Sequence, residues 1–149
     1  MKIKNILTPA VISVGLKSTT KAGVIGELLD LLVAAKLVTD RGKALAAVME
    51  REQKMSTGIE HGVAIPHGKT DAVKGLAACI GISREGVDFA SLDGQPSTIF
   101  IMTLSPVDRV GPHVQFLAEV SMVIKAEAAR RKLLEAKSAR DVLDVFGIQ

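Results

Sequence analysis

Hydrophobic and polar positions divide the first third of the chain into one strand and two helices. A β-branched run over residues 11–16 predicts a strand. Apolar residues then recur at helical spacing in two stretches, with capping residues before the first (Ser18-Thr19-Thr20) and the second (Thr39-Asp40). The second helix should end near Gln53. The apolar faces comprise Val24, Ile25, Leu28, Leu29, Leu32 and Val33 in the first helix, and Ala44, Leu45, Val48 and Met49 in the second.

The pattern over residues 63–104 predicts a β-sheet. A brief extended stretch covers residues 63–65, and the apolar runs over residues 76–83 and 97–104 are typical of buried strands. Turn signals at Arg84-Glu85-Gly86 and Asp93-Gly94 should separate them. These strands predict a mixed sheet.

The last third is mostly helical. The pattern from Pro112 onward predicts a helix, and Ser138 with Asp141 has capping-box spacing before another. We therefore predict an α/β fold: a single domain over residues 1–149, with a mixed sheet flanked by helices in a three-layer α/β/α arrangement. The expected apolar positions are Val114, Leu117, Ala118, Val120 and Met122 in the first helix, and Val142, Leu143 and Phe146 in the second.

Composition narrows the function classes. The 149 residues are 48% hydrophobic, enough for one core, and the only cysteine, Cys79, lies in an apolar run that suits a buried thiol in a reducing cytoplasm. Aromatic residues make up 3%, without Trp or Tyr, and the net charge is only +3, which argues against nucleic-acid binding. Asp30 and Lys36 interrupt the most hydrophobic stretch, so we expect a cytoplasmic protein without membrane insertion.

The main candidate for a catalytic residue is a histidine in a Gly-rich segment over residues 58–68. His67 follows a short apolar strand and Pro66, which fixes its own φ and lacks a backbone donor, while Gly68 permits close approach. A neutral imidazole is a nucleophile near pH 7 when a hydrogen bond on one ring nitrogen frees the other. If the electrophile is a phosphoryl group, Arg51, His113 and backbone N–H groups supply suitable stabilising charge.

The segment from Ser56 to Gly68, with its core Ala64-Ile65-Pro66-His67-Gly68, resembles the signature of enzyme IIA components of the fructose/mannitol type in the bacterial phosphotransferase system. The resemblance implies that His67 accepts phosphate from the phosphocarrier HPr and passes it to a IIB domain in sugar uptake. It also implies that His113 helps to hold the phosphoryl group and that Arg51 stabilises its charge. No metal or other cofactor is implied.

Other interpretations stay open at this stage. Glu60-His61 departs from the small or neutral residues common in that family, which bears on partner choice. A nitrogen-type IIA protein of the same family acts instead through phosphorylation-dependent protein binding. A third hypothesis is a metal-dependent hydrolase built on His61, His67 and His113, although supporting Cys or carboxylate spacing is lacking. The sequence names neither the sugar nor the downstream acceptor.

Each candidate residue also has an ordinary structural interpretation. His67 suits a tight turn, and His113 suits the start of a helix with its side chain bonded to the backbone. His61 suits a solvated loop, and Arg51 suits the exposed face of a charged helix. The signature favours the functional interpretation for His67 most strongly.

Overall fold

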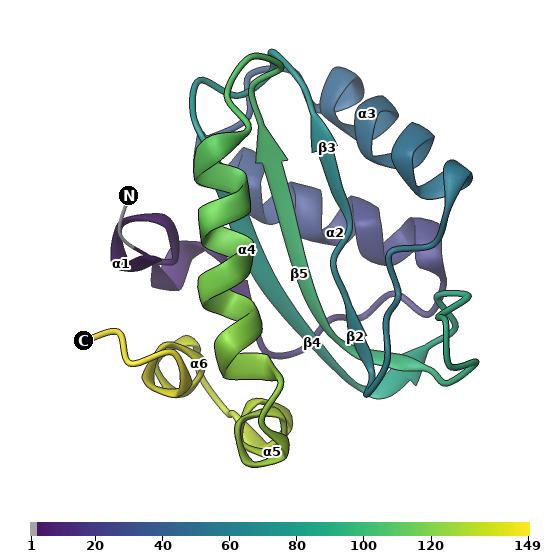
Figure 1. The fold of residues 1–149 in the computed structure, drawn as a ribbon, viewed down its shortest axis with the longest axis vertical. Helices are drawn as coiled ribbons and strands as arrows, with labels where there is room; N and C mark the ends of the chain where they lie inside the picture. The colour runs from purple at the N-terminus through teal and green to yellow at the C-terminus, as the bar shows by residue number, and fades with distance from the viewer. Residues whose placement is uncertain (1–2) are drawn as a thin grey trace.

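The computed structural model describes residues 3–149, so residues 1 and 2 of the predicted domain lie outside the described part. Helices and strands alternate along the chain (Figure 1). The elements in order are α1 (Ile3–Ile6), the 3-10 turn η1 (Pro9–Val11), β1 (Ile12–Ser13), α2 (Lys21–Ala34), α3 (Arg41–Lys54), β2 (Val63–Ala64), β3 (His67–Lys69), β4 (Ala77–Val87), β5 (Ser97–Ser105), α4 (Gly111–Ile124), α5 (Glu127–Glu135) and α6 (Ala139–Val145).

The sheet has five strands and is mixed, as predicted. Its order is β1-β4-β5-β2, and β3 also pairs with β5. The central pair β4–β5 is antiparallel, whereas β1 runs parallel to β4, and both β2 and β3 run parallel to β5. Consequently β2 and β3 share one edge of β5, one after the other along the chain.

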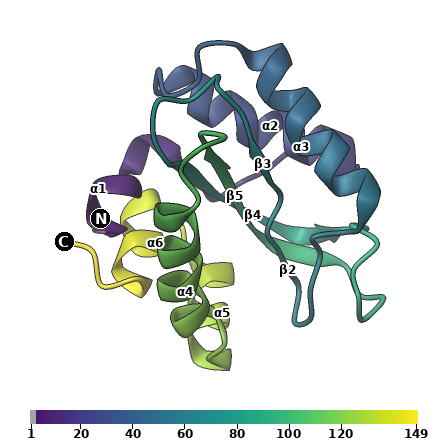
Figure 2. The same ribbon diagram turned by 45° about the horizontal axis from the view of Figure 1, so that its top comes forward.

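Helices cover both faces of the sheet, which confirms the predicted three-layer arrangement (Figure 2). Helices α2 and α3 bury one face in a core that includes Leu28, Val48, Phe100 and Met102. The other face packs under α4, α5 and α6, where Phe116 and Val142 meet β5 residues such as Ile101. Because side chains alternate along β5, consecutive residues of one strand enter opposite cores.

The predicted helix starts are confirmed. Thr20 caps α2 by accepting the N–H of Gly23, and Asp40 caps α3 by accepting that of Lys43. Ser138 caps α6 in the same way. These side chains satisfy backbone donors that the first turn leaves open, so the capping signal is local and readable from sequence.

Two pattern-based predictions are wrong. The turn predicted at Arg84-Glu85-Gly86 is a register irregularity inside β4, where Gly86 has a φ of 83° and the Arg84 guanidinium donates to backbone carbonyls of neighbouring elements. In α4 the inward face comprises His113, Phe116, Val120 and Ile124, whereas Val114 and Met122 are exposed. Apolar residues occupy more than one face of α4, so spacing alone misjudged its orientation.

The first strand is shorter than predicted, although Leu16 still donates its N–H to the carbonyl of Ile82 in β4. The predicted turn at Asp93-Gly94 is confirmed, with the N–H of Gly94 bonded to the Ser91 carbonyl. Within residues 3–149, every helix is too short or too polar to cross a lipid bilayer.

Candidate functional site

The edge strand β3 carries His67, where the sequence predicted only the end of a strand. Val63 and Ala64 pair with Ile99 and Phe100, and pairing resumes with His67 opposite Thr103. Pro66 lies in the interruption, where its missing N–H costs no ladder bond, and its carbonyl accepts the N–H of Thr103. The imidazole is therefore held on a paired strand rather than in a free loop.

The tautomer of His67 follows from its hydrogen bond. Nδ1 lies 2.9 Å from the carbonyl oxygen of Ile65. A carbonyl oxygen can only accept, so Nδ1 carries the hydrogen in the neutral ring and Nε2 keeps its lone pair. The half-buried ring is thus fixed in the form that presents Nε2 as a nucleophile.

His113 lies beside His67, as the sequence predicted. The two ring centroids are 5.5 Å apart, with the ring planes inclined at 53°. His113 is 8% exposed, and its Nε2 lies 3.0 Å from Oγ1 of Thr103, the residue paired with His67 across the sheet. Burial chiefly lowers the pKa of His113, and the nearby charges of His67 and Lys69 lower it further. His113 is therefore a neutral neighbour at pH 7.

The start of α4 adds positive potential at the same place. His113 is in the first turn of α4, and Val110, at the N-cap position, provides no side-chain hydrogen bond to the open backbone N–H groups. A helix N-terminus carries a partial positive charge, which favours an anion. The end of β5, the start of α4 and β3 all lie near the top of Figure 1.

Arg51 and His67 line one hollow of about 440 Å³ between α3 and β3. Nη1 of Arg51 donates to the carbonyl of Met55 at 2.8 Å, and the half-buried side chain sits in the last turn of α3. Two further cations line the hollow, against a single carboxylate. The lining residues are Ala47, Glu50, Arg51, Lys54, His67, Gly68 and Lys69.

Lys69 is the site residue that sequence reasoning missed. Residues two apart on a strand point to the same face, so Lys69 and His67 share a face of β3. An extended stretch ending at residue 65 gave no reason to expect this alternation. Had the strand been continued past Pro66, the period of two would have identified Lys69.

His61 lies apart from the other two histidines. It occupies a left-handed conformation with a φ of 64° and lines a separate hollow with Ser121 and Lys125, near the C-terminal end of α4. His113 is at the opposite end of that helix, which at 14 residues is about 20 Å long. The hydrolase hypothesis on His61, His67 and His113 is therefore wrong, because these residues do not converge.

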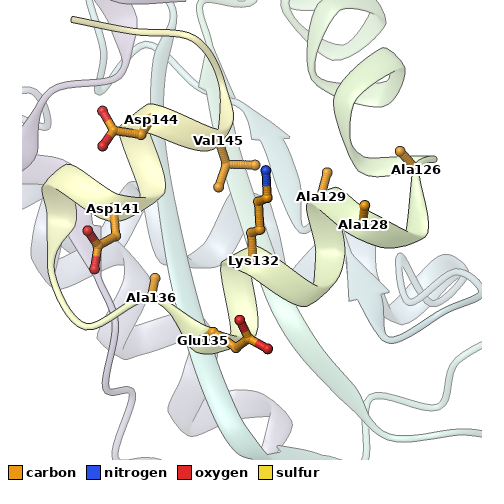
Figure 3. Close-up of a pocket in the computed structure, with 9 residues that line it drawn as sticks. All are labelled: Ala126, Ala128, Ala129, Lys132, Glu135, Ala136, Asp141, Asp144 and Val145. Atoms are coloured by element: carbon orange, nitrogen blue, oxygen red, sulfur yellow. The ribbon is translucent and has the colours of Figure 1, made fainter.

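A larger hollow, of about 530 Å³, lies between α5 and α6 (Figure 3). Its floor contains alanines, and Lys132 projects into it between the two helices. The carboxylate of Asp141 accepts the N–H of Lys137, and that of Asp144 pairs with Arg140. Among the described residues, no histidine, cysteine, serine or threonine lines this hollow.

Comparisons with known proteins identify the family of the whole chain. The family model described as "Phosphoenolpyruvate-dependent sugar phosphotransferase system, EIIA 2" matches residues 5–147. The fructose-specific EIIA component of Haloferax volcanii is 41% identical over 144 residues, covering 97% of this chain and 94% of that protein. The fructose-specific EIIABC component of Bacillus subtilis is 37% identical over 146 residues, which cover 98% of this chain but only 23% of that longer protein.

Among solved structures, the nitrogen regulatory protein IIA-Ntr from Neisseria meningitidis superposes with a TM-score of 0.89 at 27% identity, covering 97% of this chain and 98% of that one. The family match spans all the strands of the sheet, including the one that holds His67, and both helical layers. The chain therefore belongs to the EIIA 2 family of the phosphoenolpyruvate-dependent sugar phosphotransferase system.

Proposed function

We propose that His67 accepts a phosphoryl group from an HPr-type phosphocarrier and passes it to a IIB domain in sugar uptake. The observation that carries this proposal is the fixed imidazole: Nδ1 is bonded to the Ile65 carbonyl, which leaves Nε2 with its lone pair at a hollow rimmed by cations. The proposal places a single IIA-type domain over residues 1–149 in the cytoplasm, where HPr-type carriers act.

Transfer onto His67 is a displacement at phosphorus. The Nε2 lone pair forms the new N–P bond, while the bond from phosphorus to the donor breaks and its electron pair leaves with the donor. The hydrogen stays on Nδ1 throughout, donated to the Ile65 carbonyl, so the step needs no separate proton acceptor on the protein. In the onward step an acceptor thiolate of the IIB domain attacks phosphorus, and the N–P bond breaks back to Nε2.

Charge stabilisation comes from groups already in place. Arg51 and Lys69 are the cations that we assign to the equatorial phosphoryl oxygens, and the start of α4 adds its backbone dipole. His113, neutral and held by Thr103 beside His67, is the ring that we assign to holding the phosphoryl group. Preorganised groups of this kind stabilise the transferring charge without rearranging during the reaction.

The direct test is labelling from phosphoenolpyruvate through enzyme I and HPr. We expect an acid-labile, base-stable label on the parent protein and none on His67→Ala. His61→Ala is the matched control, because His61 lies outside the site, and it should label like the parent. Label retained on folded His67→Ala would contradict the assignment of His67 as the acceptor. An unlabelled parent protein, beside a control IIA that is labelled, would contradict the assignment of HPr as the donor.

A nitrogen-type regulatory role is the second candidate. It is favoured by the likeness to the IIA-Ntr structure, which extends over 97% of the chain. In this role His67 is still phosphorylated, but the phosphorylated and free forms differ in their binding to a regulatory target protein rather than in delivery to a IIB domain.

The two candidates separate on onward transfer. Labelled protein should be mixed with a purified fructose-type IIB domain and with the same domain lacking its acceptor cysteine. Rapid movement of label to the intact IIB domain alone supports sugar uptake. Retention of label on His67, with a control fructose IIA discharging fully in parallel, supports the regulatory role.

A further inference from the structure

A buried carboxylate lies next to Arg51 in α3 but outside the hollow that His67 lines. Glu52 is 5% exposed. Its oxygens accept the backbone N–H of Thr57 at 2.9 Å and the Thr57 hydroxyl at 2.7 Å, and Oε1 lies 2.8 Å from Nζ of Lys21. A carboxylate buried this deeply needs such partners, because desolvation of an unpaired charge is costly.

Lys21 closes this cluster from the first turn of α2. Its Nζ donates to the carbonyl of Phe89 at 3.3 Å and lies 4.8 Å from the centre of the Phe89 ring. The same carbonyl accepts the hydroxyl of Ser56 at 2.6 Å. The turn that follows α3 is therefore held by side chains from both helices and by the loop after β4.

One route leads from this turn to Arg51. Met55, the residue after α3, precedes the two residues that Glu52 and Phe89 hold. Its carbonyl is the acceptor for Nη1 of Arg51 at 2.8 Å. The position of the guanidinium thus depends on where the turn holds this carbonyl.

A second route leads from the same turn to His67. The carbonyl of Thr57 accepts the N–H of Ile65 at 3.0 Å, within a short antiparallel pairing that also joins Gly58 to Ala64. The carbonyl of Ile65 in turn accepts Nδ1 of His67. Thr57 and Ile65 therefore connect Glu52 to the hydrogen bond that fixes the His67 ring.

We propose that Glu52, held by its ion pair with Lys21, is a positioning residue. Through the Met55–Thr57 turn it sets both the tautomer of His67 and the position of the Arg51 guanidinium. The proposal rests on the proposed function for the rate of transfer, but its effect on the imidazole is independent of any phosphoryl donor. Glu52 does not touch the phosphoryl group. Its role is to keep nucleophile and cation in one geometry.

The test uses Glu52→Gln, which keeps the size of the side chain and removes the charge paired with Lys21. We expect kcat for transfer from HPr to fall about tenfold, while KM for HPr stays within about twofold, since misplacement by a fraction of an ångström affects the reacting geometry and not docking. In ¹⁵N spectra recorded at alkaline pH, the His67 ring should change from the Nδ1–H form to a mixture of tautomers.

Matched variants separate positioning from loss of stability. Thr57→Val removes the hydroxyl donor and should resemble Glu52→Gln, whereas Thr57→Ser keeps the donor and should restore the parent rate and ring signals. Val142→Ala weakens the core on the far face of the sheet. This variant should lower the melting temperature without changing kcat or the ¹⁵N signals of His67.

Parent-like kcat and ring signals in folded Glu52→Gln would overturn the proposal. The same tautomer mixture in Val142→Ala would also overturn the proposal, because the mixture would then result from a general loss of stability rather than from the loss of Glu52. An unlabelled parent would count against phosphoryl transfer itself, while the ¹⁵N comparison would still decide whether Glu52 positions His67.

Discussion

At the scale of single residues, two neighbouring histidines acquire different properties from their surroundings. His67 is half-buried on an edge strand with Nδ1 committed to a carbonyl, which leaves Nε2 for chemistry. His113 is buried against Thr103, and its lowered pKa keeps it neutral. One residue type therefore serves as nucleophile in one position and as a neutral neighbour in the other.

The depressed pKa of His113 predicts a pH dependence of stability. The unfolded residue titrates near 6.5 and the folded one below that value. Below pH 6.5 the unfolded chain binds a proton at His113 that the folded chain disfavours. The free energy of unfolding therefore decreases as the pH decreases, by at most ~1.4 kcal/mol per pH unit for one proton. Urea denaturation at pH 7.5 and at pH 5.5 should show a smaller loss for His113→Gln than for the parent. Equal losses would contradict this account.

Lys69 should contribute to transfer through its charge. We expect Lys69→Met to lower kcat for phosphorylation by roughly 10- to 100-fold, because a preorganised cation near the transferring group is worth a few kcal/mol. Lys74→Met is the control, since Lys74 is exposed and absent from the hollow. Similar rates for the two variants in rapid-quench labelling would remove Lys69 from the site.

At the scale of elements, the contact between α3 and β3 builds the hollow. A Cβ at Gly68 would lie 3.1 Å from backbone atoms of both Ala47 and Val48. The sequence predicted that Gly68 lets a ligand or partner approach the backbone closely. In the structure, the group that approaches Gly68 closely is helix α3. The close approach brings Arg51 and Lys54 to the edge strand that holds His67.

Gly68→Ala should therefore be destabilising. The helix backbone can yield only by shifting as a unit, so we expect a loss of about 1–3 kcal/mol in the free energy of unfolding. Gly75→Ala is a matched control, because nothing lies within 4 Å of its added Cβ and its backbone has no positive φ. Chemical denaturation of both variants measures the difference; equal stability of the two would show that α3 is not tightly seated on β3.

At the scale of the whole molecule, the site opens beside exposed apolar residues. Val107, Val110 and Val114 are 56%, 40% and 60% exposed and lie in or next to the loop that leads into α4. An apolar surface next to a cationic hollow suits a protein partner that must approach His67 closely. We expect carrier proteins to dock here.

Val114→Glu should raise KM for HPr about tenfold or more with little change in kcat, since a buried charge at the centre of an interface opposes docking. Met122→Glu is the control on the same helix, because Met122 is 71% exposed but lies two turns further from His113. Steady-state labelling at varied HPr concentration separates the two constants. A larger effect of Met122→Glu would place the docking surface elsewhere on the molecule.

Features that depend on neighbours along the chain were predictable from the amino-acid pattern. Capping side chains act within one helical turn, so Thr20, Asp40 and Ser138 marked helix starts correctly. Long apolar runs found the central strands, and the signature around His67 pointed to the family that the comparisons confirm. The roles of His67, His113 and Arg51 remain predictions, now with the three residues placed around one region.

Features that depend on distant parts of the chain became apparent only in the folded molecule. The pairing of β3 with β5 revealed the alternation that places Lys69 beside His67, and packing selected the face of α4 that carries His113. The buried link from Lys21 through Glu52 to the turn before His67 joins residues on two helices and a loop. Burial and long-range hydrogen bonding are properties of the folded chain, and local sequence patterns do not contain them.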